Sequence, residues 1–234
     1  MKNKFLKGLV SSFALAVSGF ANAGLIELVD NGGFESGNFT DWSVTNLGSG
    51  GCGLNVWSVS SSGIHGCSDN NGVTVVAPIN GTFAAYNTFD GPAGTLQLTQ
   101  SILLPTLVDS FSLSWFQTVD MNGGGIPRTF SVDFYTGINS LIGNVSSQQF
   151  SSGAFQNWTQ FNFDVTSLLS SYSGQEVKLS FRNIVPTSFT GPAGFGLDSV
   201  SLVANTVDVP EPSTIAIFTL SLLGLASRKF KNKV

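Results

Sequence analysis

The sequence predicts an all-β fold, a two-sheet antiparallel sandwich, flanked by an N-terminal apolar segment and a C-terminal apolar helix. Apolar and polar residues alternate with a period of two in many short runs, which is typical of strands with one buried face. Gly, Asn, Ser and Pro separate these runs, and no long segment shows the 3.6-residue period of a helix. Ten or so short strands in one domain favour a sandwich.

The strands are expected where the alternation is clearest. Phe111, Leu113 and Trp115 alternate with serines, which places Trp115 in the core. Similar alternation covers residues 130–135, 160–165 and 177–182, and further strands are expected at 25–29, 40–45, 54–59, 73–76, 82–86, 95–103 and 195–204. Only Thr166 to Tyr172 is expected to form a turn of helix, and the alternation does not settle the orientation of Trp42.

The N-terminal segment has the features of a secretory signal peptide. Met1 to Lys7 carries three lysines, Gly8 to Phe20 is apolar, and Ala21-Asn22-Ala23 is a small-x-small cleavage site. The mature chain is therefore expected to begin at Gly24. The alternative is an N-terminal anchor that is retained.

The C-terminal segment combines Val209-Pro210-Glu211-Pro212 with an apolar run, Thr214 to Ala226, and a basic end, Arg228 to Lys233. Each proline fixes φ and removes an N–H, so this motif should stay extended and accessible. The 13 apolar residues are too few for a ~30 Å hydrocarbon core unless their flanks contribute. The basic residues behind them predict a cytoplasmic C-terminus.

This tail resembles the PEP-CTERM sorting signal of Gram-negative bacteria. The resemblance implies export across the inner membrane, a membrane-bound intermediate, cleavage near the triplet by an exosortase-type enzyme, and delivery to the cell surface or to extracellular polysaccharide. The expected parts are a signal peptide at 1–23, a folded domain at 24–208 and a sorting signal at 209–234. The alternative for the tail is an ordinary C-terminal anchor.

The folded part is strongly acidic once both ends are set aside. Of ten basic residues, three lie in the signal peptide and four in the tail, which leaves Arg128, Lys178 and Arg182 against 13 carboxylates between Gly24 and Asp208. A net charge of about −10 argues against nucleic acid or anionic lipid as a partner, because no basic patch could neutralise phosphates. It favours cations and neutral ligands.

The two cysteines, Cys52 and Cys67, enclose 14 residues in the exported part. In an oxidising compartment they are expected to form a disulfide, which for a loop of this length is worth ~3 kcal/mol in the chain-entropy account. A zinc site is the alternative, but His65 is the single histidine of the sequence.

Several stretches resemble jelly-roll carbohydrate-binding modules of the family 4/9/16/22 type. They are Asn31-Gly32-Gly33-Phe34-Glu35 with Asp41-Trp42, then Gly94 to Gln100, Gly174 to Phe181, and Phe195 to Leu202. The resemblance implies that the two-sheet antiparallel sandwich is a jelly roll. It also implies a structural Ca²⁺ held by an early glutamate and a late aspartate, which here correspond to Glu35 and Asp198. The alternative is that these two carboxylates solvate loops or cap turns.

The residues around Asp198 also predict a β-bulge. Phe195 and Leu197 keep one phase of alternation, while Val200 and Leu202 keep the other. A slip of one residue at Asp198-Ser199 is the pattern of a bulge, which re-aims a side chain.

A glycan-binding face should combine aromatic rings with hydrogen-bonding groups, because a sugar presents both C–H faces and hydroxyls. Three groups of side chains point away from the apolar side of their strands: Trp158, Gln160 and Asn162; Tyr135 and Asp133; and Arg182 and Lys178. These are the ligand-face candidates. For Trp158, a place at a sheet edge or under a loop is the alternative.

No catalytic constellation is expected. A Ser-His-Asp triad would need His65, which lies in a Gly- and Ser-rich loop, and no G-x-S-x-G turn occurs. The sequence therefore predicts an exported, non-enzymatic component of an extracellular matrix that serves glycan association or matrix structure. A secreted polysaccharide hydrolase on the same scaffold, or a structural matrix protein without a ligand, are the alternatives.

Overall fold

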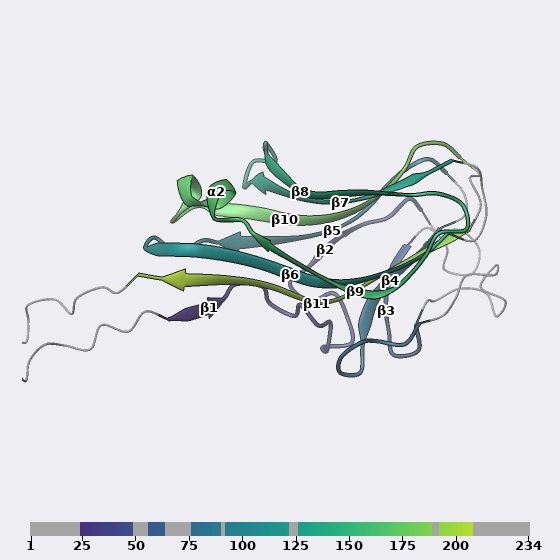
Figure 1. Cartoon of the computed structure of the whole chain (residues 1–234), viewed down its shortest axis with the longest axis horizontal. Coiled ribbons are helices and arrows are strands. Elements are labelled where there is room, and N and C mark those ends of the chain that lie inside the picture. Colours follow the sequence, from purple (N-terminus) through teal and green to yellow (C-terminus); the bar gives the residue numbers. More distant parts are fainter. Residues whose placement is uncertain are drawn as a thin grey trace, which may run out of the picture. The chain divides into compact units, whose positions relative to one another are not determined.

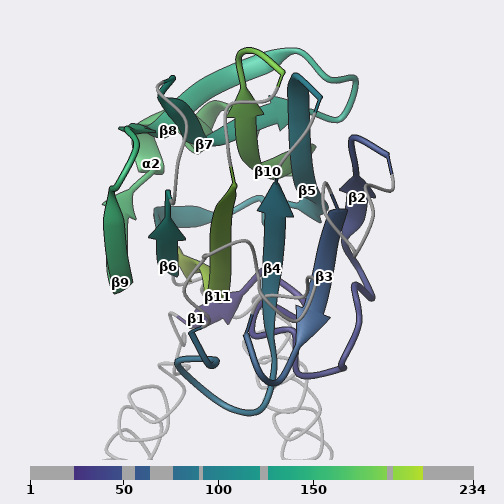
Figure 2. The ribbon, with the colours of Figure 1, turned by 90° about the vertical axis from the view of Figure 1, so that its right-hand side faces the viewer.

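A computed structural model describes residues 24–48, 56–63, 76–89, 92–121, 126–188 and 192–207 of the chain (Figure 1). Residues Leu25–Thr206 form one compact unit. Within it, two antiparallel sheets lie in separate layers, as Figures 1 and 2 show, and this confirms the predicted all-β sandwich.

Sheet A has the strand order β3-β4-β11-β6-β9, and β1 pairs with β11 beside this path. Its strands are β1 (Leu25–Glu27), β3 (Val56–Ser60), β4 (Ala84–Phe89), β6 (Val108–Asp120), β9 (Phe155–Asp164) and β11 (Ala193–Thr206). Sheet B has the order β2-β5-β10-β7-β8. Its strands are β2 (Ser43–Thr45), β5 (Gly94–Leu103), β7 (Arg128–Thr136), β8 (Leu141–Phe150) and β10 (Glu176–Val185). From β4 onwards the chain crosses repeatedly between the sheets, as in a jelly roll.

The sequence predicted these strands with one exception. Strand β8, Leu141–Phe150, was not expected, because its pairing with β7 shifts register at two places and its apolar residues do not alternate. Of the predicted strand at 73–76, residues 73–75 lie outside the described residues. Val76 is described and is not in a strand. The predicted helical turn is confirmed as α2 (Thr166–Leu169) followed by η3 (Ser170–Tyr172).

The core lies between the two sheets and is rich in aromatic rings. Trp115 is fully buried, as predicted, and stacks on Phe161 and Phe163 with ring centroids 5.3 and 5.4 Å away. Trp42 is also buried and packs on Phe34 and Phe181. Such pairs add packing energy beyond the area they bury.

Strand β11 is the centre of sheet A although it comes last in the fold. It pairs with β4 through residues 193–197, with β1 through residues 203–205, and with β6 along most of its length. The register against β6 shifts between Asp198 and Ser201, and Ser199 has φ 50°. This confirms the predicted bulge.

Among the residues that the structure describes, no helix is long and apolar enough to cross a membrane. The predicted signal peptide and sorting helix lie outside the described residues, as do Cys52 and Cys67.

Candidate functional site

The seven ligand-face candidates separate onto two different sheets. Trp158, Gln160 and Asn162 lie on β9 in sheet A. The other four lie on β7 and β10 in sheet B: Tyr135, Asp133, Lys178 and Arg182. Because both sets point away from the inter-sheet core, they face opposite sides of the sandwich. One ligand site cannot include both.

Trp158 already has partners within the protein. Its indole Nε1 donates a hydrogen bond to the carbonyl oxygen of Ala77 at 2.7 Å, and its ring packs edge-on against Tyr86. A Cβ atom at Gly196 would lie 2.9 Å from the Trp158 ring, so the glycine makes room for it. Gln160 and Asn162 are exposed beside it. The indole therefore holds the segment at Ala77 against sheet A rather than presenting a free aromatic surface.

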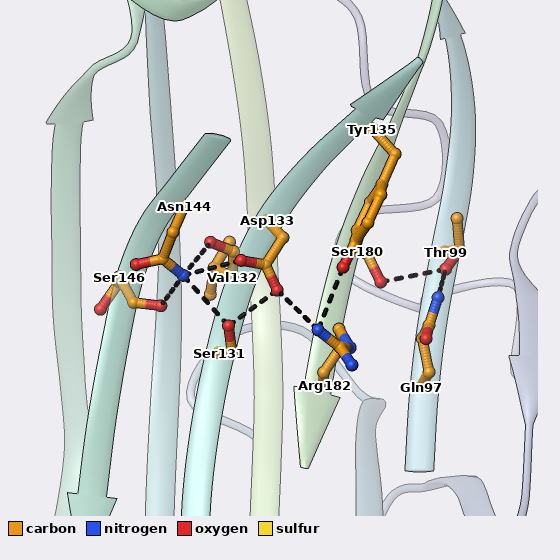
Figure 3. A network of polar contacts seen from close by, with 10 residues as sticks. All are labelled: Gln97, Thr99, Ser131, Val132, Asp133, Tyr135, Asn144, Ser146, Ser180 and Arg182. Carbon is orange, nitrogen blue, oxygen red and sulfur yellow. Dashed lines mark hydrogen bonds and ion pairs between the residues drawn. The ribbon is translucent and has the colours of Figure 1, made fainter. Parts of the chain in front are cut away.

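The outer face of sheet B carries a connected set of polar side chains (Figure 3). Asp133 lies at its centre: its Oδ2 accepts hydrogen bonds from Ser131 Oγ at 2.7 Å and from Arg182 Nη1 at 3.3 Å. Its Oδ1 accepts a hydrogen bond from Asn144 Nδ2 at 2.7 Å. Only 5% of the Asp133 side chain is exposed, so this carboxylate needs these donors.

Arg182 links Asp133 to the phenol of Tyr135. Its Nη1 donates to Tyr135 Oη at 3.0 Å as well as to Asp133. Burial raises the pKa of Tyr135, the Asp133 carboxylate raises it further, and the Arg182 guanidinium opposes both. The phenol therefore stays protonated at neutral pH and can both donate and accept hydrogen bonds.

The polar face extends across β10 to β5. Thr99 and Ser180 share a hydrogen bond at 3.2 Å across the β5–β10 pair, and Gln97 Nε2 donates to Thr99 Oγ1 at 2.7 Å. At the other end of β10, Lys178 Nζ donates to Asn139 Oδ1 at 2.8 Å. In the part of the chain that the structure describes, Lys178 has no carboxylate partner.

These side chains surround a hollow of about 220 Å³ on sheet B. The residues that line it share hydrogen-bonding ability: Gln97, Thr99, Tyr135, Asn139, Lys178 and Arg182. The volume is below the ~300–1,000 Å³ of pockets for drug-sized molecules, so the hollow suits a small polar group.

Gln97, Thr99 and Asn139 are not among the site residues predicted from the sequence. Gln97 and Thr99 do lie on the polar phase of the predicted strand 95–103, so alternation could have indicated their orientation. Alternation could not indicate that β5, β10 and β7 are adjacent strands of one sheet. Asn139 lies in the β7–β8 hairpin with φ 69°, and it reaches the site because of that turn.

Glu35 and Asp198, the predicted calcium ligands, both bind backbone amides of one segment. Glu35 accepts hydrogen bonds from the N–H groups of Thr82 and Phe83 at 2.9 and 3.0 Å. Asp198 Oδ2 accepts from Ile79 and Asn80 at 3.1 and 3.2 Å. Burial raises the pKa of Asp198, and these hydrogen bonds partly oppose the shift.

The donors around Glu35 and Asp198 do not fit a calcium shell. Calcium takes six to eight oxygen ligands, whereas these carboxylates accept hydrogen bonds mainly from N–H groups. Among the described residues, no three His, Cys, Asp or Glu side chains gather as metal ligands. The arrangement matches the alternative in which the two carboxylates cap a turn, here at residues 79–83. Calcium binding stays a prediction.

Comparison with known proteins identifies the tail. Residues 208–229 match the PEP-CTERM protein-sorting motif. The chain carries this sorting signal. The PEP-CTERM signal marks the protein for export and surface sorting, with anchoring in the membrane before exosortase processing. It includes Val209, Pro210, Glu211 and Pro212, the predicted cleavage region.

The sandwich resembles several solved structures at low identity, and a comparison with curated proteins found no match. TmCBM61 in complex with β-1,4-galactotriose is 16% identical, with a TM-score of 0.47 over 76% of this chain and 97% of that chain. The CBM22-1 xylan-binding domain of Paenibacillus barcinonensis Xyn10C is 13% identical, with a TM-score of 0.39 over 81% and 99%. A Stig cyclase from Fischerella sp. TAU is 16% identical, with a TM-score of 0.49 over 79% and 100%. These likenesses carry no information about the ligand or activity of this chain.

Proposed function

We propose that the exported sandwich binds a polysaccharide of the cell surface or matrix through the outer face of sheet B. The observation that carries this proposal is the hollow on β5, β7 and β10, lined by six hydrogen-bonding side chains. The contacts of Asp133, Arg182 and Ser180 hold several of these groups in fixed positions before any ligand arrives. Such preorganisation lowers the entropic cost of binding.

The chemistry of the lining suits a sugar. Gln97, Thr99 and Asn139 offer neutral donors and acceptors to hydroxyl groups, and Tyr135 adds a ring edge for a C–H face. Lys178 and Arg182 contribute the positive charge in a domain that is otherwise acidic. The sorting signal supports the proposal because it implies export and surface sorting, which would bring the domain into contact with polysaccharide outside the cell.

Binding rather than hydrolysis is supported by the composition of the lining. Most glycoside hydrolases place two carboxyl groups about the scissile bond. The described residues around the hollow include no Asp or Glu, and the nearby Asp133 is engaged by three donors. The hydrolase alternative remains testable by release of reducing sugar from any polysaccharide that binds.

A glycan array and calorimetry on the fragment 24–208 test the proposal. For a polysaccharide that binds, Gln97→Ala and Lys178→Ala should each weaken binding about fivefold or more, because each removes a hydrogen bond worth ~1 kcal/mol or more. Gln160→Ala is the matched control, because Gln160 is an exposed polar residue on sheet A. Equal losses in all three variants would contradict the site, and binding to no glycan would favour a structural role.

A further inference from the structure

The end of the sandwich from which the chain leaves for its tail carries a group of exposed apolar side chains. We call this group the apolar rim: Leu25, Leu103, Leu107, Ile138 and Leu141. Their exposed fractions are between 50% and 85%. Solvent-exposed apolar residues are ordinary when scattered, but a concentration at one end suggests a contact surface.

Strand register places these residues at the same end. Leu25 pairs with Asn205, and Thr206 pairs with Val108, next to Leu107. On sheet B, Leu103 pairs with Glu176, and Tyr135 pairs with Leu141. Figure 1 shows the start of β1, the end of β11 and the start of β10 together at this end.

Backbone hydrogen bonds join the loops that carry the rim. Leu104 N donates to Gln175 O at 3.0 Å, and Gly174 N donates back to Leu104 O at 3.1 Å. Gly137 N donates to Glu176 O at 3.1 Å, which fixes the β7–β8 hairpin beside the start of β10. The rim is therefore held on a rigid support, as a docking surface requires.

The short stretch of chain between the sandwich and its sorting motif indicates which molecule contacts the end of the sandwich that carries the apolar rim. Strand β11 is paired up to Thr206, and only Val207, Asp208 and Val209 precede the Pro-Glu-Pro triplet at 210–212. Three residues span at most about 11 Å when fully extended. One α-helix with its side chains is already about 10–12 Å thick, so an enzyme that encloses the triplet must also contact the end of the sandwich.

We propose that the apolar rim is the surface on which the processing enzyme docks when it engages the PEP-CTERM motif. A lipid surface fits the same end less well. Asp109, Asp164 and Glu176 are exposed there, and the cation that the described residues place close by, Lys178, is half-buried, so anionic headgroups would be repelled. A protein partner can match both the apolar side chains and the surrounding acids. This proposal is independent of glycan binding.

Processing of the full chain in cells that contain the exosortase tests the proposal. Leu107→Ser and Ile138→Ser should each slow conversion of precursor to mature protein about fivefold to tenfold, as expected for the loss of an apolar contact at an interface. Phe155→Ser is the matched control, because Phe155 is 55% exposed but pairs with Asp120 at the opposite end of sheet A. Equal processing of all variants, at equal resistance to proteolysis, would overturn the proposal.

Two further measurements separate docking from other effects. Insertion of six Gly and Ser residues between Val207 and Asp208 adds about 20 Å of reach, so rim substitutions should no longer matter in that chain. If they slow it equally, the rim does not act by docking. A photo-reactive residue at position 107, in cells with an inactive exosortase, should crosslink to that enzyme. Adducts with lipid alone, or none, would contradict the proposal.

Discussion

At the scale of single residues, the buried carboxylate of Asp198 is the feature with the clearest consequence for stability. Its side chain has no exposed area, and its partners are backbone amides of Ile79 and Asn80 and the hydroxyl of Ser199. Among the described residues, no cation pairs with it. Burial therefore destabilises the charged carboxylate more than these hydrogen bonds stabilise it. As a result, the pKa of Asp198 is raised above its ordinary value of 3.8.

We expect the free energy of unfolding to fall as pH rises through this raised pKa. Between 3.8 and the folded pKa, the native protein binds more protons than the unfolded chain, so the contribution of Asp198 is complete at acidic pH and is lost above the folded pKa. Asp198→Asn keeps the shape of the side chain without the titration. Urea unfolding between pH 3 and 8 should show the variant gaining stability relative to the natural protein as pH rises. A difference that does not change with pH would contradict this expectation.

The orientation of a side chain could be predicted from the sequence where it depends only on the alternation within its own strand. The phases that placed Trp115 inside and Tyr135 outside follow from the two-residue period of a strand. For Trp158, the structure agrees with the alternative of a place at a sheet edge or under a loop, because β9 is an edge strand and the indole binds Ala77, 81 residues away in the sequence. No local pattern indicates which distant segment will cover an outward-facing ring.

At the scale of elements, the bulge in β11 depends on a glycine in the first loop. Gly32 O accepts a hydrogen bond from Val200 N at 2.9 Å, and a Cβ atom on Gly32 would lie 1.9 Å from the oxygen of Val200. The oxygen and carbon atoms of Val200 that this Cβ would meet belong to the backbone, so they cannot rotate away as a side chain could. The loop that begins with Asn31 therefore has to pass the bulge without a side chain at this position.

Gly32→Ala should destabilise the fold by about 3 kcal/mol or more, because the backbone of β11 or of the loop must shift. Gly33→Ala is the control in the adjacent position: its Cβ would meet Glu35 Cγ at 3.6 Å, an ordinary contact. It should change stability by less than about 1 kcal/mol. Urea unfolding of the two variants measures the difference, and similar midpoints would show that the close approach at Gly32 does not matter.

The sequence predicted the bulge but not its neighbour. The change of phase between Leu197 and Val200 is visible within one strand, whereas the contact with Gly32 joins segments about 170 residues apart. Strand β8 was missed for a related reason. Its register shifts against β7 replace alternation with the irregular pattern of an edge strand, and its pairing is visible only once β7 is in place.

The candidate site has the same division between local and distant information. Asp133 and Tyr135 were selected by their phase on one strand, and the structure brings them together with Arg182 on the next. The hollow also needs Gln97 and Thr99 from β5, which is adjacent to β10 but far from it in sequence. Strand order, which no periodicity encodes, decides which outward side chains form one face.

At the scale of the whole molecule, the position of β11 links folding to completion of the chain. This strand is the last of the sandwich, yet it pairs with β1, β4 and β6 and lies in the middle of sheet A. Its buried residues include Phe195, Leu197 and Leu202. Burial of three such side chains is worth roughly 5–9 kcal/mol, a large part of the ~5–15 kcal/mol by which domains are stable.

We therefore expect the sandwich to fold only after β11 is available, and to need nothing beyond it. A chain that begins at Gly24 and ends at Val207 should unfold cooperatively in urea, because residues 25–206 already form one compact unit. A chain that ends at Pro192 lacks β11, leaves β1 without a partner, and should be digested rapidly by protease. Cooperative unfolding of the shorter chain would contradict the central role of β11. Failure of the longer chain to fold would show instead that the tail contributes to the stability of the sandwich.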